Sequence, residues 1–143
     1  MKLEKVGRLE LTYTDMDEEL SYQDGGQVYG ILTGKLEAGE LEGTLHTTNL
    51  ARQRPDGVFT PTLRGLLTTS QGAKLFFTMD GLSLRDPKAN PPRRQVVAGI
   101  TFWTADPKFR SWNDVYLVAE LEGRAVGNAW GVVGNLYQCI PEL

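Results

Sequence analysis

Apolar and polar residues alternate along most of this chain with a period close to two. Leu9 and Leu11 alternate with Arg8 and Glu10 near the start, and later stretches repeat the pattern. Successive side chains of a β-strand point to opposite faces of its sheet, whereas a helix repeats every 3.6 residues. No stretch of ten or more residues has a convincing helical stripe, so the pattern predicts an all-β protein.

Turn residues divide the chain into short, regular segments. Ala38-Gly39, Ser70-Gln71-Gly72 and the Glu122-Gly123-Arg124 region are expected turns, and Arg54-Pro55-Asp56-Gly57 has residues suited to a tight turn. Loops are expected at 14–26, 49–57 and 85–94, and 105–113 is expected to form a compact connection with one helical turn after Asp106-Pro107. Strands are expected near residues 6–13, 27–37, 41–46, 58–69, 73–84, 95–104, 114–122 and 127–140.

Short connections without crossover helices require antiparallel pairing, because parallel strands need a crossover of a dozen or more residues. A sandwich and a barrel both fit about eight or nine such strands. Glycines within the strand patterns, such as Gly30, Gly34 and Gly43, favour a barrel, because they often mark bends or bulges. We therefore expect a single antiparallel β-barrel domain over residues 1–143.

Composition narrows the range of functions. The 143 residues carry 15 Lys and Arg against 18 Asp and Glu, so the formal net charge is −3. This balance provides no basic surface for nucleic acid and no membrane affinity. The lone cysteine, Cys139, cannot form an internal disulfide, and the first residues lack the apolar segment of a secretory signal. We expect a cytoplasmic protein with a buried thiol.

Three stretches resemble the bacterial family catalogued as domain of unknown function 3237, and the similarity is spread over roughly residues 8–140. They are residues 30–37 with 41–44, residues 54–57 with 63–69 and Gly72, and residues 102–113, which include Asp106-Pro107 and Trp112-Asn113. The third stretch is the most specific. The resemblance implies a β-barrel and no reaction. The chain departs from the family pattern at 45–49, where relatives tend to have a glycine-rich stretch with an Asp.

The sequence holds few groups for catalysis. One histidine, His46, and one cysteine make a structural zinc site implausible, and no cofactor is indicated. Nucleophile elbows and phosphate-binding glycine loops are absent from the sequence. His46 can act as an acid or base, or lie on the surface at a strand end. Any catalysis is therefore expected to be cofactor-free acid–base work, such as isomerisation or cyclisation.

Two groups of residues are candidates for ligand binding. Arg64 and Asp80 lie on the two arms of the 58–84 hairpin and are expected to be near neighbours, pointing either inward as a functional pair or outward as a surface pair. Trp103, Trp112 and Asn113 offer apolar walls and an amide, although Asn113 can equally tie down its own loop.

Our leading hypothesis is a barrel that binds a small apolar or amphipathic molecule, since about eight strands enclose room for one such ligand. The candidate ligand-binding residues are Arg64, Asp80, Trp103, Trp112, Asn113 and His46. Alanine at Arg64 and at Asn113 is expected to abolish binding. The alternative is a non-catalytic, self-associating module whose interior is filled by its own side chains. Phe76 and Phe77 must face opposite sides of the sheet, and an exposed aromatic row makes a homo-oligomer plausible.

Overall fold

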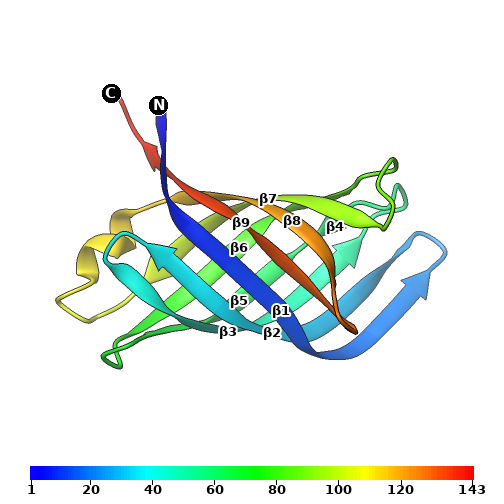
Figure 1. Ribbon diagram of the computed structural model, residues 1–143, viewed down its shortest axis with the longest axis horizontal. Helices are drawn as coiled ribbons and strands as arrows, with labels where there is room; N and C mark the ends of the chain where they lie inside the picture. Colours follow the sequence, from blue (N-terminus) through cyan, green and yellow to red (C-terminus); the bar gives the residue numbers. More distant parts are fainter.

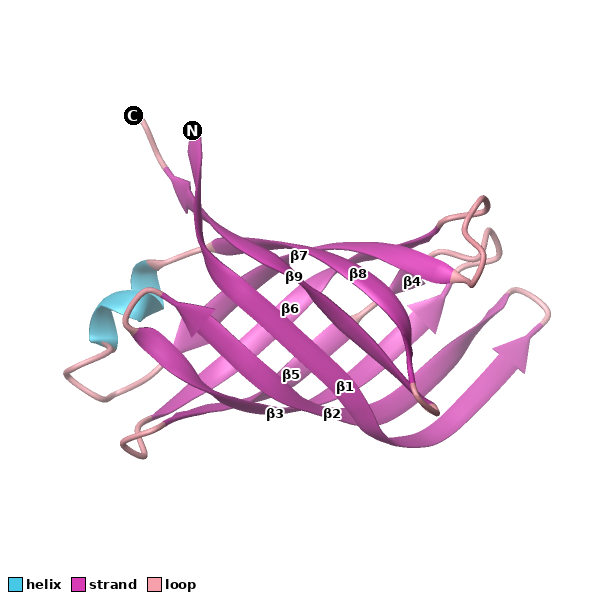
Figure 2. Cartoon of the chain, in the orientation of Figure 1, coloured by secondary structure: helices cyan, strands magenta, loops and turns pink.

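The computed structural model describes the backbone of residues 1–143 and the side chains of all of them except 16–19 and 22. Strands account for nearly all of its regular structure (Figures 1 and 2). The elements are β1 (Lys2–Tyr22), β2 (Gly25–Ala38), β3 (Leu41–Gln53), β4 (Phe59–Thr60), β5 (Thr62–Thr69), β6 (Lys74–Arg85), β7 (Arg93–Trp103), the 3-10 helix η1 (Arg110–Asp114), β8 (Leu117–Val126) and β9 (Ala129–Ile140).

Eight long strands close into an antiparallel barrel. β1 pairs with both β2 and β9, so the first and last strands complete the circle. The remaining neighbours are β2–β3, β3–β5, β5–β6, β6–β7, β7–β8 and β8–β9, and the two-residue β4 bridges β3 and β6 at one end. The predicted all-β barrel with one short helical turn is thus confirmed, and the sandwich is excluded.

The alternating pattern decides which side chains face the interior. In β6 the exposed fraction of Phe77 is 1%, whereas its neighbour Phe76 is 62% exposed on the outer surface. The expectation that these two rings face opposite sides is therefore confirmed. Inward rows of leucine and other apolar side chains form the core: Leu9, Leu11, Leu36, Leu41, Leu45, Leu67, Leu75, Phe77, Ile100, Leu117 and Leu136.

Three local expectations are corrected. The loop expected at 14–26 is instead mostly strand, because β1 and β2 continue to a turn at 23–24, with two register shifts between Tyr13 and Glu18. The last hairpin turns at Gly127, not at 122–124, because Gly127 adopts a φ of 60° that suits the first position of a tight hairpin turn. The strand expected at 58–69 is divided at Pro61, which has no amide hydrogen to donate.

The connections sort to the two ends of the barrel (Figure 1). One end has the 39–40 and 70–73 turns and the 104–116 connection, with η1. The other has the 23–24 turn, the 54–58 and 86–92 loops and the 127–128 turn. Within the described chain, no helix is long and apolar enough to cross a membrane.

Candidate functional site

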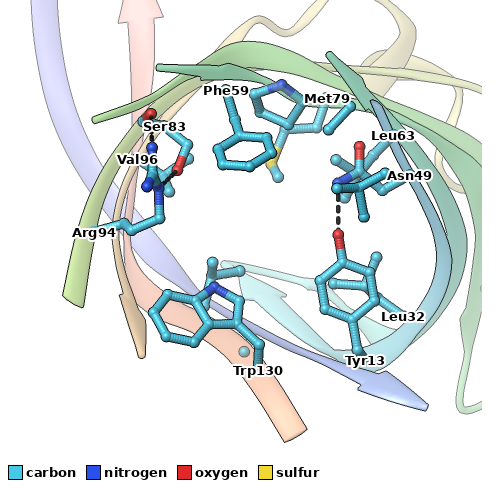
Figure 3. A pocket seen from close by; sticks show the side chains of 15 residues that line it. Tyr13, Leu32, Asn49, Phe59, Leu63, Met79, Ser83, Arg94, Val96 and Trp130 are labelled. Atoms are coloured by element: carbon cyan, nitrogen blue, oxygen red, sulfur yellow. Dashed lines mark hydrogen bonds between the residues drawn. The ribbon is translucent and has the colours of Figure 1, made fainter. Parts of the chain in front are cut away.

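A cavity of about 410 Å³ occupies the second of these ends, which we call the cavity end. The opposite end, where leucines fill the interior, is the filled end. Residues from eight strands and Pro61 line the cavity: Tyr13, Val28, Leu32, Asn49, Ala51, Phe59, Pro61, Leu63, Met79, Ser83, Arg94, Val96, Trp130, Gly131 and Val132 (Figure 3). The lining is mostly apolar, and a few polar groups point inward.

The polar groups arise because the inward rows of some strands change from apolar to polar toward the cavity end. The row of β1 runs Leu9, Leu11, Tyr13. The row of β7, read toward the cavity end, ends at Val96 and Arg94. β3 and β6 behave in the same way and reach the cavity with Asn49 and Ser83. The period that builds the filled core therefore also delivers polar side chains into the cavity.

Arg94 is held in a fixed orientation on one wall. Its Nε donates to Ser83 Oγ at 2.8 Å, and its Nη2 donates to the carbonyl oxygens of Ser83 at 2.7 Å and Gly57 at 2.8 Å. The guanidinium carbon lies 4.8 Å from the centroid of the Phe59 ring, which is a cation–π contact. These contacts engage Nε and Nη2 and leave Nη1 for another acceptor.

The charge of Arg94 has no neutralising partner among the described side chains. Among the side chains that the structure describes, no carboxylate forms an ion pair with Arg94. Burial, and secondarily the nearby positive charge of Arg85, lower the pKa of Arg94 from its usual value. Arginine nevertheless stays protonated at neutral pH, so this wall of the cavity is cationic.

Tyr13 and Asn49 form the polar part of the opposite wall (Figure 3). Asn49 Nδ2 donates to the Tyr13 hydroxyl at 2.7 Å, and Asn49 Oδ1 accepts from the backbone amide of Thr62 at 3.0 Å. Burial raises the pKa of Tyr13 more than the Asn49 hydrogen bond lowers it. The phenol is therefore neutral over the physiological range.

Trp130 forms an aromatic wall whose place depends on a glycine. A β-carbon at Gly123 would lie 3.3 Å from both Cζ2 and Nε1 of Trp130, so the indole packs closely on the strand β8 backbone. Gly123 also lies beside Arg94, since a β-carbon there would be 3.4 Å from Arg94 Cβ. The absence of a side chain at 123 thus lets the indole and the arginine stem share one wall.

The chemical inventory of the cavity is one cation, hydroxyl groups, an amide and apolar surface. The described lining contains no Asp, Glu, His or Cys. Nor do three such side chains gather anywhere in the described part of the chain in a way that could hold a metal ion. The arrangement can therefore bind an anion and donate hydrogen bonds within apolar surroundings.

The six residues proposed from the sequence do not line this cavity. Arg64 and Asp80 are neighbours, as expected, and their Nη1–Oδ1 distance is 3.0 Å. Their side chains are 51% and 54% exposed on the outside of the barrel, so of the two alternatives the structure has the outward pair. His46 is also exposed on the outer face.

The aromatic candidates and Asn113 belong to the filled end. Trp103 is 58% exposed beside Phe76, with ring centroids 6.3 Å apart. Trp112 packs edge-on against Phe102 at 6.0 Å. Asn113 accepts from the Thr104 amide at 2.8 Å and donates to its carbonyl at 2.9 Å. Of the roles weighed for Asn113, tying down its own connection is the one these contacts display.

Sequence reasoning missed Tyr13, Asn49, Arg94 and Trp130. Asn49 and Arg94 were assigned to loops, at 49–57 and 85–94, so the inward rows were not extended to them. The signal was available: counting by twos from Ile100 through Ala98 and Val96 reaches Arg94, an arginine on an inward row. A polar residue at the end of such a row marks the mouth of a barrel.

Comparison with known proteins supports the fold alone. No family model matches the chain, and no curated protein matches it. A β-barrel-like protein from Acinetobacter baumannii AYE has a TM-score of 0.76 at 18% identity, covering 96% of this chain and 94% of that one. A conserved protein of unknown function from Rhodopseudomonas palustris has a TM-score of 0.77 at 13% identity, covering 97% of both chains. An enzyme from Penicillium herquei has a TM-score of 0.58 at 19% identity, covering 94% of this chain and 93% of that one. The chain thus shares the fold of β-barrel proteins of unknown function.

Proposed function

We propose that this protein binds a small, largely apolar organic anion in the cavity. The observation that carries the proposal is Arg94, a half-buried cation on the cavity wall with no ion-paired carboxylate among the described side chains. An unpaired charge that has lost part of its water is costly, and a ligand carboxylate offsets that cost. Arginine suits this task because its planar guanidinium matches a carboxylate.

The rest of the lining sets the character of the ligand body. Phe59, Trp130, Val96, Val132 and Met79 present aromatic and aliphatic surface around the polar groups. A volume of 410 Å³ falls within the range of small-molecule pockets, and eight-stranded barrels leave room for one small ligand. These features support an aromatic or aliphatic acid rather than a sugar or a nucleotide.

The test is calorimetric titration with two probes of the same carbon skeleton, the anion 4-benzylbenzoate and the neutral amide 4-benzylbenzamide. The proteins are the wild type, Arg94→Gln and the matched control Arg64→Gln, which removes an exposed arginine from the outer surface. Arg94→Gln is expected to weaken binding of the acid by about 10- to 100-fold, as loss of a charged hydrogen bond does, and to change binding of the amide little. Arg64→Gln is expected to bind both as the wild type does.

The proposal fails if the acid binds no better than the amide, or if Arg64→Gln weakens binding as much as Arg94→Gln. Thermal melting of each variant controls for unfolding, because Arg94 also holds Ser83 and Gly57.

Cofactor-free isomerisation or cyclisation remains a hypothesis about this same site. Tyr13 supports it as a group on the described lining that can give a proton, and one structural neighbour is described as an enzyme. Mass-spectrometric and chromatographic comparison of a bound compound before and after incubation distinguishes conversion from simple binding.

The second candidate function is self-association through the outer face of β6 and β7. Phe76 pairs with Trp103 and Leu82 with Val97 across these strands, and all four are exposed. Such a row favours a second copy of the chain. Light scattering after size exclusion is expected to give an oligomer for the wild type and for Leu50→Glu, and a monomer for Trp103→Glu. A monomeric wild type at tens of micromolar would exclude this candidate.

We also propose that the chain belongs to the domain-of-unknown-function 3237 family and acts in the cytoplasm. The 102–113 stretch supports the first, and the lone, unpaired Cys139 agrees with the second. An alignment of homologues that fails to retain Asp106-Pro107 and Trp112-Asn113 would remove the first, and fractionation of the source cells tests the second.

A further inference from the structure

The orientation of the Asn49 amide is determined by its two partners. The backbone N–H of Thr62 can only donate, so the atom 3.0 Å from it must be the amide oxygen. The amide nitrogen must then be the atom that lies 2.7 Å from the Tyr13 hydroxyl. Because an amide nitrogen only donates, the oxygen of Tyr13 is the acceptor in this pair.

This pairing leaves the proton of Tyr13 without an acceptor at Asn49. A phenol has one proton and accepts through its oxygen lone pairs, so the proton must point away from the Asn49 nitrogen. No described side chain or backbone group accepts from Tyr13 in the structure, and the hydroxyl lies on the cavity wall (Figure 3). The burial that raises the pKa of Tyr13 keeps this proton in place at neutral pH.

Two inward donors therefore stand on opposite walls of the same cavity. Arg94 supplies a positive charge, and Tyr13 supplies a neutral O–H (Figure 3). The two are separated by apolar surface that includes Leu32, Met79 and Trp130. A ligand that satisfied Arg94 alone would leave the Tyr13 hydroxyl buried without an acceptor, which costs free energy.

We propose that the ligand is an oxo acid: an apolar or aromatic molecule with an acidic group for Arg94 and a carbonyl oxygen that accepts from Tyr13. This inference rests on the anion-binding function proposed above and names its substrate class. Tyr13 is then the residue that selects a carbonyl over a methylene. Asn49 is a positioning residue, because it acts through Tyr13.

The experiment uses two pairs of acids that differ only at the carbonyl: 4-benzoylbenzoate with 4-benzylbenzoate, and benzoylformate with phenylacetate. Two pairs are needed because the spacing between acid and carbonyl differs between them. For the pair whose spacing fits, the wild type is expected to bind the ketone about 3- to 10-fold more tightly, the range for one neutral hydrogen bond. Tyr13→Phe is expected to bind both members of that pair equally.

Isotope-edited infrared spectra of the bound ketone report directly on a hydrogen bond to its carbonyl. A purely structural role of Tyr13 would not change the carbonyl stretching frequency. With a ¹³C-labelled ketone carbonyl, the wild type is expected to shift the stretching band to lower frequency than Tyr13→Phe does. Asn49→Leu keeps the Tyr13 hydroxyl but removes the amide that positions it, so this variant is expected to weaken the shift. The wild-type spectrum alone keeps the inference testable if a variant is poorly folded.

The outcomes separate the two proposals. If both members of both pairs bind equally to the wild type, and binding depends on Arg94, the oxo-acid inference is wrong and anion binding stands. An unshifted ketone band leads to the same conclusion. If none of the acids binds in an Arg94-dependent way, the anion-binding function is wrong and the oxo-acid inference falls with it.

Discussion

The same eight strands form both ends of this barrel, but their side chains fill the interior at one end and enclose a cavity at the other. At the filled end, leucines from strands around the barrel, among them Leu36, Leu67 and Leu117, are 0% exposed and fill the interior. At the cavity end the same inward rows finish in Tyr13 and Arg94, around about 410 Å³. The contrast teaches that one continuous sheet can enclose a packed core in one half and a cavity in the other.

The ends also differ in how they are closed. The filled end is covered by the 104–116 connection, where Phe109 is 5% exposed within the core and Trp112 packs against Phe102. At the cavity end the loops at 54–58 and 86–92 are polar, and Gly57 contributes a carbonyl to the Arg94 guanidinium. One connection therefore completes a core, whereas the 54–58 loop helps to orient the Arg94 side chain on the cavity wall.

The largest expected difference between the ends is in the cost of removing a leucine. Leu67→Ala leaves a closed void in the filled end and is expected to cost about 4–5 kcal/mol of unfolding free energy. Leu32→Ala only enlarges the existing cavity and is expected to cost about 2 kcal/mol. Urea unfolding measures both, and equal costs would mean that the two ends are equally packed.

Loss of the Asn113 amide is expected to act on stability alone. Asn113→Ala leaves the Thr104 N–H and C=O without their side-chain partners and is expected to destabilise the protein by about 1–3 kcal/mol. Binding of 4-benzylbenzoate at the other end is expected to stay within twofold of wild type. If the variant folds stably but no longer binds the probe, Asn113 takes part in ligand binding and the assignment to stability alone is wrong.

Adding volume is expected to show the same difference, because the filled interior tolerates a larger side chain less well than the cavity does. Ala119→Leu overpacks a position that is 0% exposed, at an expected cost of about 1–3 kcal/mol. Ala51→Leu grows into the cavity and is expected to cost less than about 1 kcal/mol, while it weakens probe binding. Thermal melts and titration of the same two variants check this. A destabilisation by Ala51→Leu as large as that by Ala119→Leu would mean that the cavity has no room for the added side chain.

The smallest expected effect is a pH dependence from Tyr13. Its pKa is raised above 10.0 in the folded protein, so above about pH 10 the unfolded chain loses this proton first. Stability is expected to fall as pH rises from 10 through the folded pKa, and less so in Tyr13→Phe. Urea midpoints of both proteins at pH 9 and pH 11 measure the difference, and parallel losses would mean that Tyr13 is not buried.

The fold could be predicted from the sequence because the signals for it are local. Alternation places Phe77 inside and Phe76 outside, and short turns enforce antiparallel neighbours. One expectation failed for a physical reason: the polar, acidic 14–26 stretch is mostly strand, since ladder hydrogen bonds between β1 and β2 outweigh its weak strand propensity.

The site was missed because it depends on where each inward row ends, and the loops expected at 49–57 and 85–94 cut two of these rows short. Arg64 and Arg94 are both strand arginines, and only the register shows that one points outward and the other into the cavity. Trp103 and Trp130 differ in the same way, since one lies on the outer surface and the other on the cavity wall. A one-residue error in the register of a strand exchanges these roles.

The three tryptophans provide the most direct test of the central claim, that the binding site is at the cavity end. Each indole N–H gives one signal in a ¹H–¹⁵N spectrum, and single Trp→Phe variants assign them to Trp103, Trp112 and Trp130. During titration with 4-benzoylbenzoate, the account predicts that the Trp130 signal moves, while those of Trp103 and Trp112 stay in place. Movement of Trp103 or Trp112 with Trp130 unchanged would locate binding at the filled end or the outer surface and would contradict the account.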